Sequence, residues 1–146
     1  MKLNLGCREL KFPGYINVDI DPTVRPDIIA DLRKRWSFAK DESIDEILAF
    51  HVIEHLPDIE HFMHEAYRVL KPRGRLILKY PHFTRVWICS RHLRAYGINL
   101  LGEFKDKFRQ EKVILRWRVN PTGLALIPDM IINFFANLRP TFAEYV

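Results

Sequence analysis

A strand, helix, strand pattern in the middle of the chain restricts its fold more than any other feature. Residues 44–50 are apolar and β-branched, as in a buried strand, and residues 75–80 repeat that character. Between them, residues 57–70 place apolar side chains at helical spacing, and Lys-Pro-Arg-Gly at 71–74 ends the predicted helix. The spaced apolar residues are Ile59, Phe62, Met63, Ala66, Val69 and Leu70. This order predicts a βαβ unit, and therefore parallel strands in an α/β sheet.

Two further apolar runs lie near the start of the chain, at residues 2–5 and 15–20. The first leads into Gly6 and the second contains Asp19. A nucleotide-binding sheet needs two features at its carboxyl edge. A turn without side chains lets the nucleotide approach the backbone closely, and a carboxylate binds the ribose hydroxyls. Only residues 6–14 connect the two runs, whereas parallel crossovers normally take a dozen or more residues. We therefore expect at most about a turn of helix there.

Composition indicates one soluble α/β domain over residues 1–146. The chain is 48% hydrophobic and 28% charged, with a formal charge of +5. Its cations are spread along the sequence, which favours a solvated basic surface and keeps nucleic acid as an alternative partner. No run approaches the roughly 20 apolar residues of a membrane span, and no signal-peptide core is present, so we expect a cytoplasmic protein. Cys7 and Cys89 are too few for a disulfide framework and are expected to be small buried residues.

The signal is weaker after Pro81. A helix is predicted over residues 91–104 and a sixth strand over 112–119. Residues 127–138 form a helix candidate that is apolar around most of its circumference, so we expect it to be deeply buried or to face a partner, as in a homodimer.

Five segments in order resemble the motifs of class I S-adenosylmethionine-dependent methyltransferases, specifically the small type 11 group. They cover roughly residues 2–82 and comprise 3–7, 14–19, 30–32, 44–56 and 68–76. The resemblance implies a Rossmann-like, mostly parallel sheet flanked by helices, here lacking the family's last strand because the chain stops at Val146. It also implies S-adenosylmethionine as cofactor and transfer of a methyl group to an acceptor. The acceptor is open among small molecules, lipids, sugars and RNA.

The resemblance assigns the cofactor contacts residue by residue. Gly6 and Cys7 would form the first turn against the methionine part, and Asp19 would bind the ribose hydroxyls. Asp31 and Leu32 would lie beside the adenine, and His51 would face the sulfonium. Because the methyl donor is already activated, a general base is optional, and His55 and His82 are the candidates. On the residues alone, without the other motifs, Asp19 and Asp31 are better explained as turn or cap acids than as cofactor contacts.

Two alternatives follow from departures in the sequence. The family has glycine where this chain has Arg8, whose Cβ disfavours positive φ by about 1 kcal/mol, so a non-catalytic binding or assembly protein is one alternative. His51, Glu54 and His55 also fit the His-x-x-Glu-His pattern of inverted zinc peptidases, although a strand end at 47–50 argues against the required helix. We expect no metal site.

Overall fold

The computed structural model of the protein describes residues 1–81, 90–97, 100–112 and 114. Its contacts divide the chain into two compact units, Met1–Phe108 and Arg109–Val146. Nearly all the described residues belong to the first unit, which holds every element and every predicted site residue discussed below. Of these site residues, His82 lies outside the described residues.

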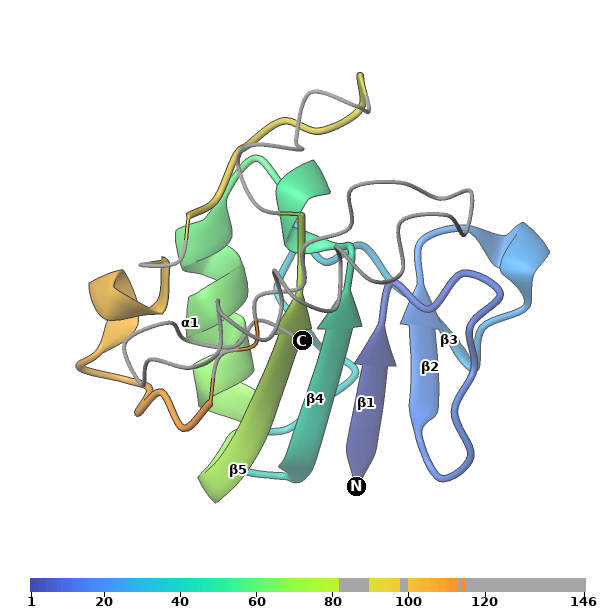
Figure 1. Cartoon of the computed structure of the whole chain (residues 1–146). Helices are drawn as coiled ribbons and strands as arrows, with labels where there is room; N and C mark the ends of the chain where they lie inside the picture. The colour runs from blue at the N-terminus through green and yellow to red at the C-terminus, as the bar shows by residue number, and fades with distance from the viewer. Residues whose placement is uncertain (82–89, 98–99, 113, 115–146) are drawn as a thin grey trace, which may run out of the picture. The chain divides into compact units, whose positions relative to one another are not determined.

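Five parallel strands form one sheet in the first unit (Figure 1). Their order is β3-β2-β1-β4-β5, so the chain moves outward in one direction from β1 to β3 and in the other from β4 to β5. The point where the direction reverses lies between β1 and β4, and ligands of such sheets bind at the carboxyl ends of the strands beside this point. The strands are β1 (Lys2–Leu5), β2 (Ile16–Asp19), β3 (Ile28–Ile29), β4 (Ile44–Phe50) and β5 (Leu70–Lys79).

The helix predicted after β4 is present as α1 (Ile59–Val69). Asp58 caps it, because its Oδ1 accepts the amide of His61 at 2.9 Å and so satisfies one of the free N–H groups of the first turn. The predicted apolar face is the buried one: Phe62, Met63, Ala66 and Val69 are buried, together with the polar Glu65. Hydrophobic spacing therefore located both the helix and its inner face.

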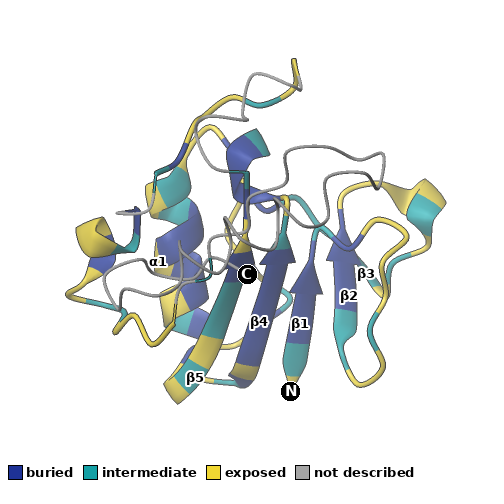
Figure 2. Cartoon of the chain, in the orientation of Figure 1, coloured by how far each residue is buried: buried dark blue, intermediate teal, exposed yellow. Residues whose placement is uncertain are grey.

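The core lies between α1 and the sheet (Figure 2). β1 and β4 supply buried aliphatic side chains, among them Leu5 and Ile47, each fully buried. Trp36, also fully buried, packs edge-on against Phe62 of α1 with ring centroids 5.3 Å apart. The backbone amide of Trp36 donates to Glu65 Oε2 at 2.7 Å. The segment between β3 and β4 is thus fixed to α1 without forming an α-helix.

The short connection between β1 and β2 contains no helix. Leu3 pairs with Ile16 and Leu5 with Val18 in parallel register. Strands of four residues span only about 13 Å, which an extended loop of this length can retrace without a helix. The side-chain amide of Asn4 donates to the carbonyl of Leu10 at 2.7 Å and holds the loop against the strand.

β5 begins earlier than predicted, directly after α1. Ile44 of β4 pairs with Leu70, but Glu46 pairs with Arg75, so the four residues between Leu70 and Arg75 bulge out of the ladder. Arg73 lies in this bulge at φ 66, a left-handed conformation that glycine would adopt without strain.

The helix predicted over residues 91–104 is wrong for the residues described. Only the 3₁₀ helix η4 (Leu100–Phe104) forms in that stretch; the other 3₁₀ helices are η1 (Pro22–Val24) and η2 (Ile53–His55). The amides of Leu93 and Arg94 donate instead to the carbonyl of Glu54, at 2.8 and 3.3 Å, and are not available for helical bonds. The predictions of a strand at 112–119 and of a helix at 127–138 concern residues that lie wholly or mainly outside the described ones. The expectation that the family's last strand is absent also concerns that part of the chain.

Candidate functional site

The turn after β1 requires glycine for two reasons. Gly6 has φ +61, and a Cβ at this position would lie 2.5 Å from Cγ2 of Val52, which follows β4. The next amide, of Cys7, donates to the carbonyl of Val18 in β2 at 3.2 Å. The turn therefore lies at the carboxyl edge of the sheet. On one side it packs against Val52, just after β4, and on the other it is hydrogen-bonded to β2.

Cys7 is buried, as predicted. Burial raises the pKa of its thiol, and the nearby charge of Asp19 raises it further. The thiol consequently stays protonated near neutral pH and acts as a small packing residue rather than a nucleophile.

Asp19 lies at the end of β2 and is bonded to two backbone amides. Its Oδ2 accepts from Arg8 at 2.8 Å and its Oδ1 from Asp21 at 3.0 Å. Its own carbonyl accepts from Ala30 at 2.9 Å, which joins the end of β2 to the segment after β3. The carboxylate thus organises two turns, and each oxygen keeps one further lone-pair direction for a ligand.

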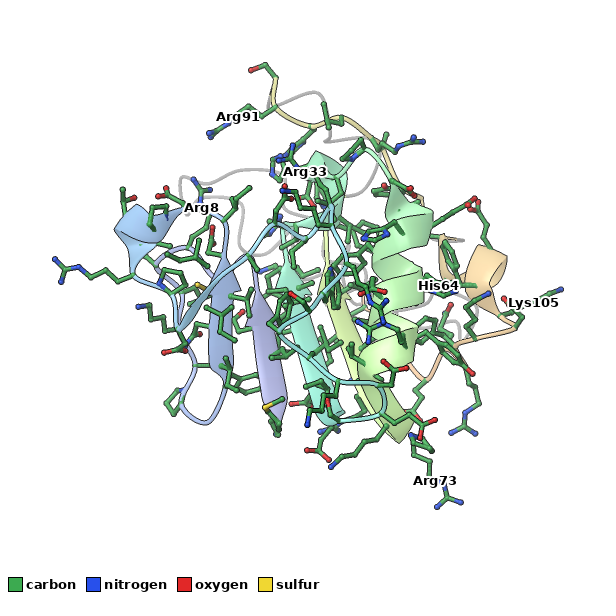
Figure 3. All side chains as sticks on the ribbon, turned by 180° about the vertical axis from the view of Figure 1, so that it is seen from behind. Arg8, Arg33, His64, Arg73, Arg91 and Lys105 are labelled. Carbon is green, nitrogen blue, oxygen red and sulfur yellow. The ribbon has the colours of Figure 1, made fainter. Side chains whose placement is uncertain are left out.

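Arg8 adopts φ 45, the left-handed conformation that glycine would take without strain. Its side chain is exposed, and in Figure 3 it projects beyond the carboxyl ends of the strands, away from the sheet. The backbone of the family's glycine turn is therefore kept in spite of the substitution.

Asp31 is engaged by its neighbour Arg33. The guanidinium Nε and Nη2 contact Oδ1 and Oδ2, each at 2.8 Å, and the Arg33 amide adds a third bond. Hydrogen bonding to Arg33 lowers the pKa of Asp31 to about 2. Leu32 is buried, and its carbonyl accepts from the indole of Trp36 at 3.2 Å. Both residues have structural partners, and their place beside an adenine stays a prediction.

His51 marks the exit from β4. It has φ 56, its amide donates to the carbonyl of Lys79 at 2.7 Å, and 54% of its side chain is exposed. Its Nδ1 lies 3.2 Å from Oε1 of the fully buried Glu54. The pattern of an inverted zinc peptidase needs both histidines on one helix, but only residues 53–55 are helical here, in a single 3₁₀ turn. The structure therefore does not build that motif.

Two histidines, His55 and His82, are the predicted candidates for a general base, and the structure describes the first of them. His55 lies in η2, with Nδ1 3.1 Å from the carbonyl of Arg91 and its ring centroid 4.9 Å from that of His92. His82 lies outside the described residues.

A separate groove of about 490 Å³ lies between the start of α1 and the segment after residue 92. Its lining includes Ile59, Tyr96 and Leu100 but none of the predicted cofactor residues. It is not the crevice that the sequence predicts.

Comparison with known proteins matches this geometry to a family. Residues 11–78 match the model of a methyltransferase domain, type 11. The fold is similar to that of an S-adenosylmethionine-dependent methyltransferase from Archaeoglobus fulgidus, with TM-score 0.64 and 16% identity over 93% of this chain and 79% of that one. The chain therefore has the fold of class I methyltransferases, and just under half of it resembles the type 11 group in sequence.

Two other solved structures share the fold of this methyltransferase domain. One is a complex of the Haloferax volcanii Trm112 methyltransferase activator with a protein assigned as a methyltransferase, with TM-score 0.60 and 15% identity over 91% of this chain and 76% of that one. The other is the PH0226 protein of Pyrococcus horikoshii, with TM-score 0.50 and 24% identity over 60% and 48%. No curated protein matches the sequence.

The methyltransferase fold brings together part of the predicted site. Gly6, Cys7 and Asp19 are linked by the contacts above, and Val52, which the family resemblance places with His51 on the sulfonium side, closes the turn from β4. Sequence reasoning placed Glu54 in one of the methyltransferase-like segments and in the peptidase motif, but gave it no role in the cofactor site. Glu54 is fully buried, and the segment 91–94 is hydrogen-bonded to its backbone carbonyl. No local sequence pattern predicts a contact with a segment so distant in the chain.

The labelled cations among the described residues lie at different ends of the sheet. In Figure 3, Arg8 and Arg91 lie toward the carboxyl ends of the strands, whereas Arg73 lies at the opposite end. This distribution agrees with the solvated basic surface predicted from the sequence. No helix among the described residues is long and apolar enough to cross a membrane.

Proposed function

We propose that this protein binds S-adenosylmethionine at the carboxyl edge of β1, β2 and β4 and transfers its methyl group to an acceptor. The observation that carries the proposal is the Gly6 turn, where a Cβ would meet Val52 at 2.5 Å, next to the carboxylate of Asp19. The glycine lets the turn pack tightly against Val52 at the strand ends, where ligands of such sheets bind, and a carboxylate with unused lone pairs suits ribose hydroxyls. The residues present therefore fit the cofactor that the fold family implies.

Each residue of the crevice has a distinct task in this proposal. Gly6 and Cys7 would hold the methionine part, Asp19 the ribose, and Asp31 with Leu32 the adenine. His51, exposed at the end of β4, would face the side from which the acceptor approaches. The bound cofactor supplies an already activated methyl group.

The chain's own contribution to catalysis would be alignment. Holding donor and acceptor in line can lower a barrier by roughly 7 to 11 kcal/mol without a nucleophile from the protein. No base is assigned, since His55 is turned toward Arg91 and His92.

A binding protein without activity is the second candidate, and Arg8 favours it. The arginine keeps the glycine backbone but adds a long cationic side chain at the carboxyl end of the strands. Cofactor binding separates the two functions, because a degenerate crevice would not bind the cofactor.

Titration calorimetry of the full chain with S-adenosylmethionine and S-adenosylhomocysteine tests the proposal. Binding to the wild type and its loss in Gly6→Ala support it. Gly14→Ala is the matched control, because Gly14 also has positive φ, at +80, but has no atom within 4 Å of an added Cβ. Absence of binding by folded wild-type protein, or equal affinities of the two variants, would contradict the assigned crevice.

A further inference from the structure

Glu54 is a buried carboxylate with an unused oxygen. The residue is fully buried, and among the described residues its Oε2 is a buried side-chain atom without a hydrogen-bond partner. The other oxygen, Oε1, faces Nδ1 of His51 at 3.2 Å. A buried carboxylate oxygen without a partner is costly, by about 1 to 3 kcal/mol or more for a charged group, so it points to a missing ligand.

Two imidazoles lie next to this carboxylate. The rings of His55 and His92 meet edge to face, with centroids 4.9 Å apart. One potential ligand atom from each of Glu54, His55 and His92 lies within 4.8 Å of the other two. The three residues come from two segments that are far apart in the sequence and are adjacent only in the fold.

The orientation of His55 is that of a metal ligand. Its Nδ1 lies 3.1 Å from the carbonyl oxygen of Arg91, and a carbonyl can only accept, so Nδ1 carries the proton. Neutral Nε2 then keeps a free lone pair. Metal-binding histidines characteristically donate their other ring N–H to a carbonyl or a carboxylate. Ligating carboxylates are likewise held by hydrogen bonds, and the contact of His51 with Oε1 of Glu54 holds this carboxylate in place.

Backbone bonds hold the two segments in place. The amides of Leu93 and Arg94 donate to the carbonyl of Glu54, and the Arg94 guanidinium donates twice to the carbonyl of Pro57, at 3.0 and 2.8 Å. These bonds fasten the two residues after His92 to η2, which carries Glu54 and His55, and to Pro57. The contact of the Arg91 carbonyl with His55 fastens the residue before His92. The cluster is therefore organised by the fold before any ion binds.

We propose that Glu54, His55 and His92 bind a divalent transition metal ion of the zinc class. Two imidazoles and one carboxylate are a donor set that suits Zn²⁺ and leaves a coordination position for water or another oxygen ligand. Ligand atoms on a tetrahedral ion lie about 3.4 Å apart, so donors within 4.8 Å of one another must close by up to about 1.4 Å, which rotations of the partly exposed histidines provide. The inference does not depend on methyl transfer, and it uses His92 in place of the His51 of the peptidase pattern.

Cobalt titration of the metal-stripped full chain tests the site, with Co²⁺ as a visible-absorbing substitute for Zn²⁺. We expect one equivalent to bind and to be displaced by Zn²⁺. Removal of a ligand in His55→Ala or His92→Ala should lower the affinity tenfold or more, and His51→Ala should lower it tenfold to a hundredfold by removing support for Glu54. No binding to folded wild-type protein would overturn the proposal.

His64→Ala is the matched control, because His61 and His64 on α1 form another histidine pair that could attract the ion. We expect this variant to bind as the wild type does, and loss of binding in it would overturn the assignment.

Glu54→Gln removes the charge with little change in shape. If that variant does not fold, the two partly exposed histidines still decide the question, and unchanged affinity in both of them would refute the site. Zn²⁺ should also raise the Tm of the wild type but not that of His92→Ala.

Discussion

The amide of Arg8 donates to Oδ2 of Asp19 at 2.8 Å and ties the turn after β1 to the acid that ends β2. The second carboxylate oxygen accepts the amide of Asp21 at 3.0 Å. The acid that the family resemblance assigns to the ribose is therefore also the acid that shapes the turns around the crevice. Asp19 therefore has a structural role in these turns and a proposed role in binding the ribose, and separate measurements of stability and affinity are needed to distinguish the two.

Replacing Asp19 with Ala should reduce both stability and cofactor affinity. Two amides near the buried carboxylate lose their acceptors, which costs about 1 to 3 kcal/mol of unfolding free energy. Urea denaturation measures this loss, and calorimetry at a temperature where the variant is folded measures affinity. Asp19→Asn keeps one oxygen acceptor and should lose less stability than Asp19→Ala. Wild-type affinity in folded Asp19→Ala would exclude the ribose role.

Replacing Arg8 with Gly should stabilise the chain. Arg8 has φ 45, a conformation that costs a residue with a Cβ about 1 kcal/mol and costs glycine almost nothing. We expect unfolding free energy to rise by several tenths to 1 kcal/mol, since the greater freedom of glycine in the unfolded chain offsets part of the gain.

The same variant tests whether the arginine obstructs the crevice. Tighter binding of S-adenosylhomocysteine by Arg8→Gly would show that the side chain crowds the ligand. Arg25→Gly is the matched control, because Arg25 has φ 52 but lies after η1, outside the predicted crevice. It should gain similar stability with no change in affinity, and a gain in affinity in both variants would contradict a local effect.

Periodic patterns predicted the fold well where local spacing determined it. Strand β4 has the predicted bounds, and α1 differs from its prediction only at the ends. The 91–104 prediction failed because the amides of Leu93 and Arg94 bond to Glu54, a partner almost forty residues earlier. Long-range hydrogen bonds of this kind leave no periodic trace in the sequence.

The candidate site was predictable in its positions but not in its contacts. Strand ends placed Gly6 and Asp19 at one edge, and the structure confirms that they are adjacent through Cys7 and Arg8. The bond between Asp31 and Arg33 and the burial of Glu54 depend on side-chain conformation and on a distant segment. Residue type and spacing alone do not carry that information.

Replacing Asp58 with Ala should weaken α1 at its first turn. Asp58 Oδ1 accepts the amide of His61, and loss of such a cap costs about 0.5 to 2 kcal/mol. Urea denaturation should show this loss for Asp58→Ala and only a small change for Asp58→Ser, which keeps a capping oxygen. Equal losses in the two variants would show that the cap bond is not the cause.

The buried ion pair of Glu65 and Arg68 should make stability depend on pH in the acid range. Hydrogen bonding to Arg68 lowers the pKa of Glu65 to about 2, and the Glu65 side chain is only 8% exposed. Its Oε2 also accepts the amide of Trp36. Because the pKa is lower in the folded state than in the unfolded state, this carboxylate stabilises the fold above the unfolded pKa near 4.5 and progressively less as pH falls toward 2.

Unfolding free energies of the wild type and Glu65→Gln, measured in urea between pH 6 and pH 2.5, test this linkage. The wild type should be more stable at pH 6 by at most about 3 kcal/mol, and the difference should shrink steadily below pH 4.5. Other carboxylates titrate in both proteins and cancel in the comparison. A constant difference for Glu65→Gln would mean that its pKa is not lowered by folding.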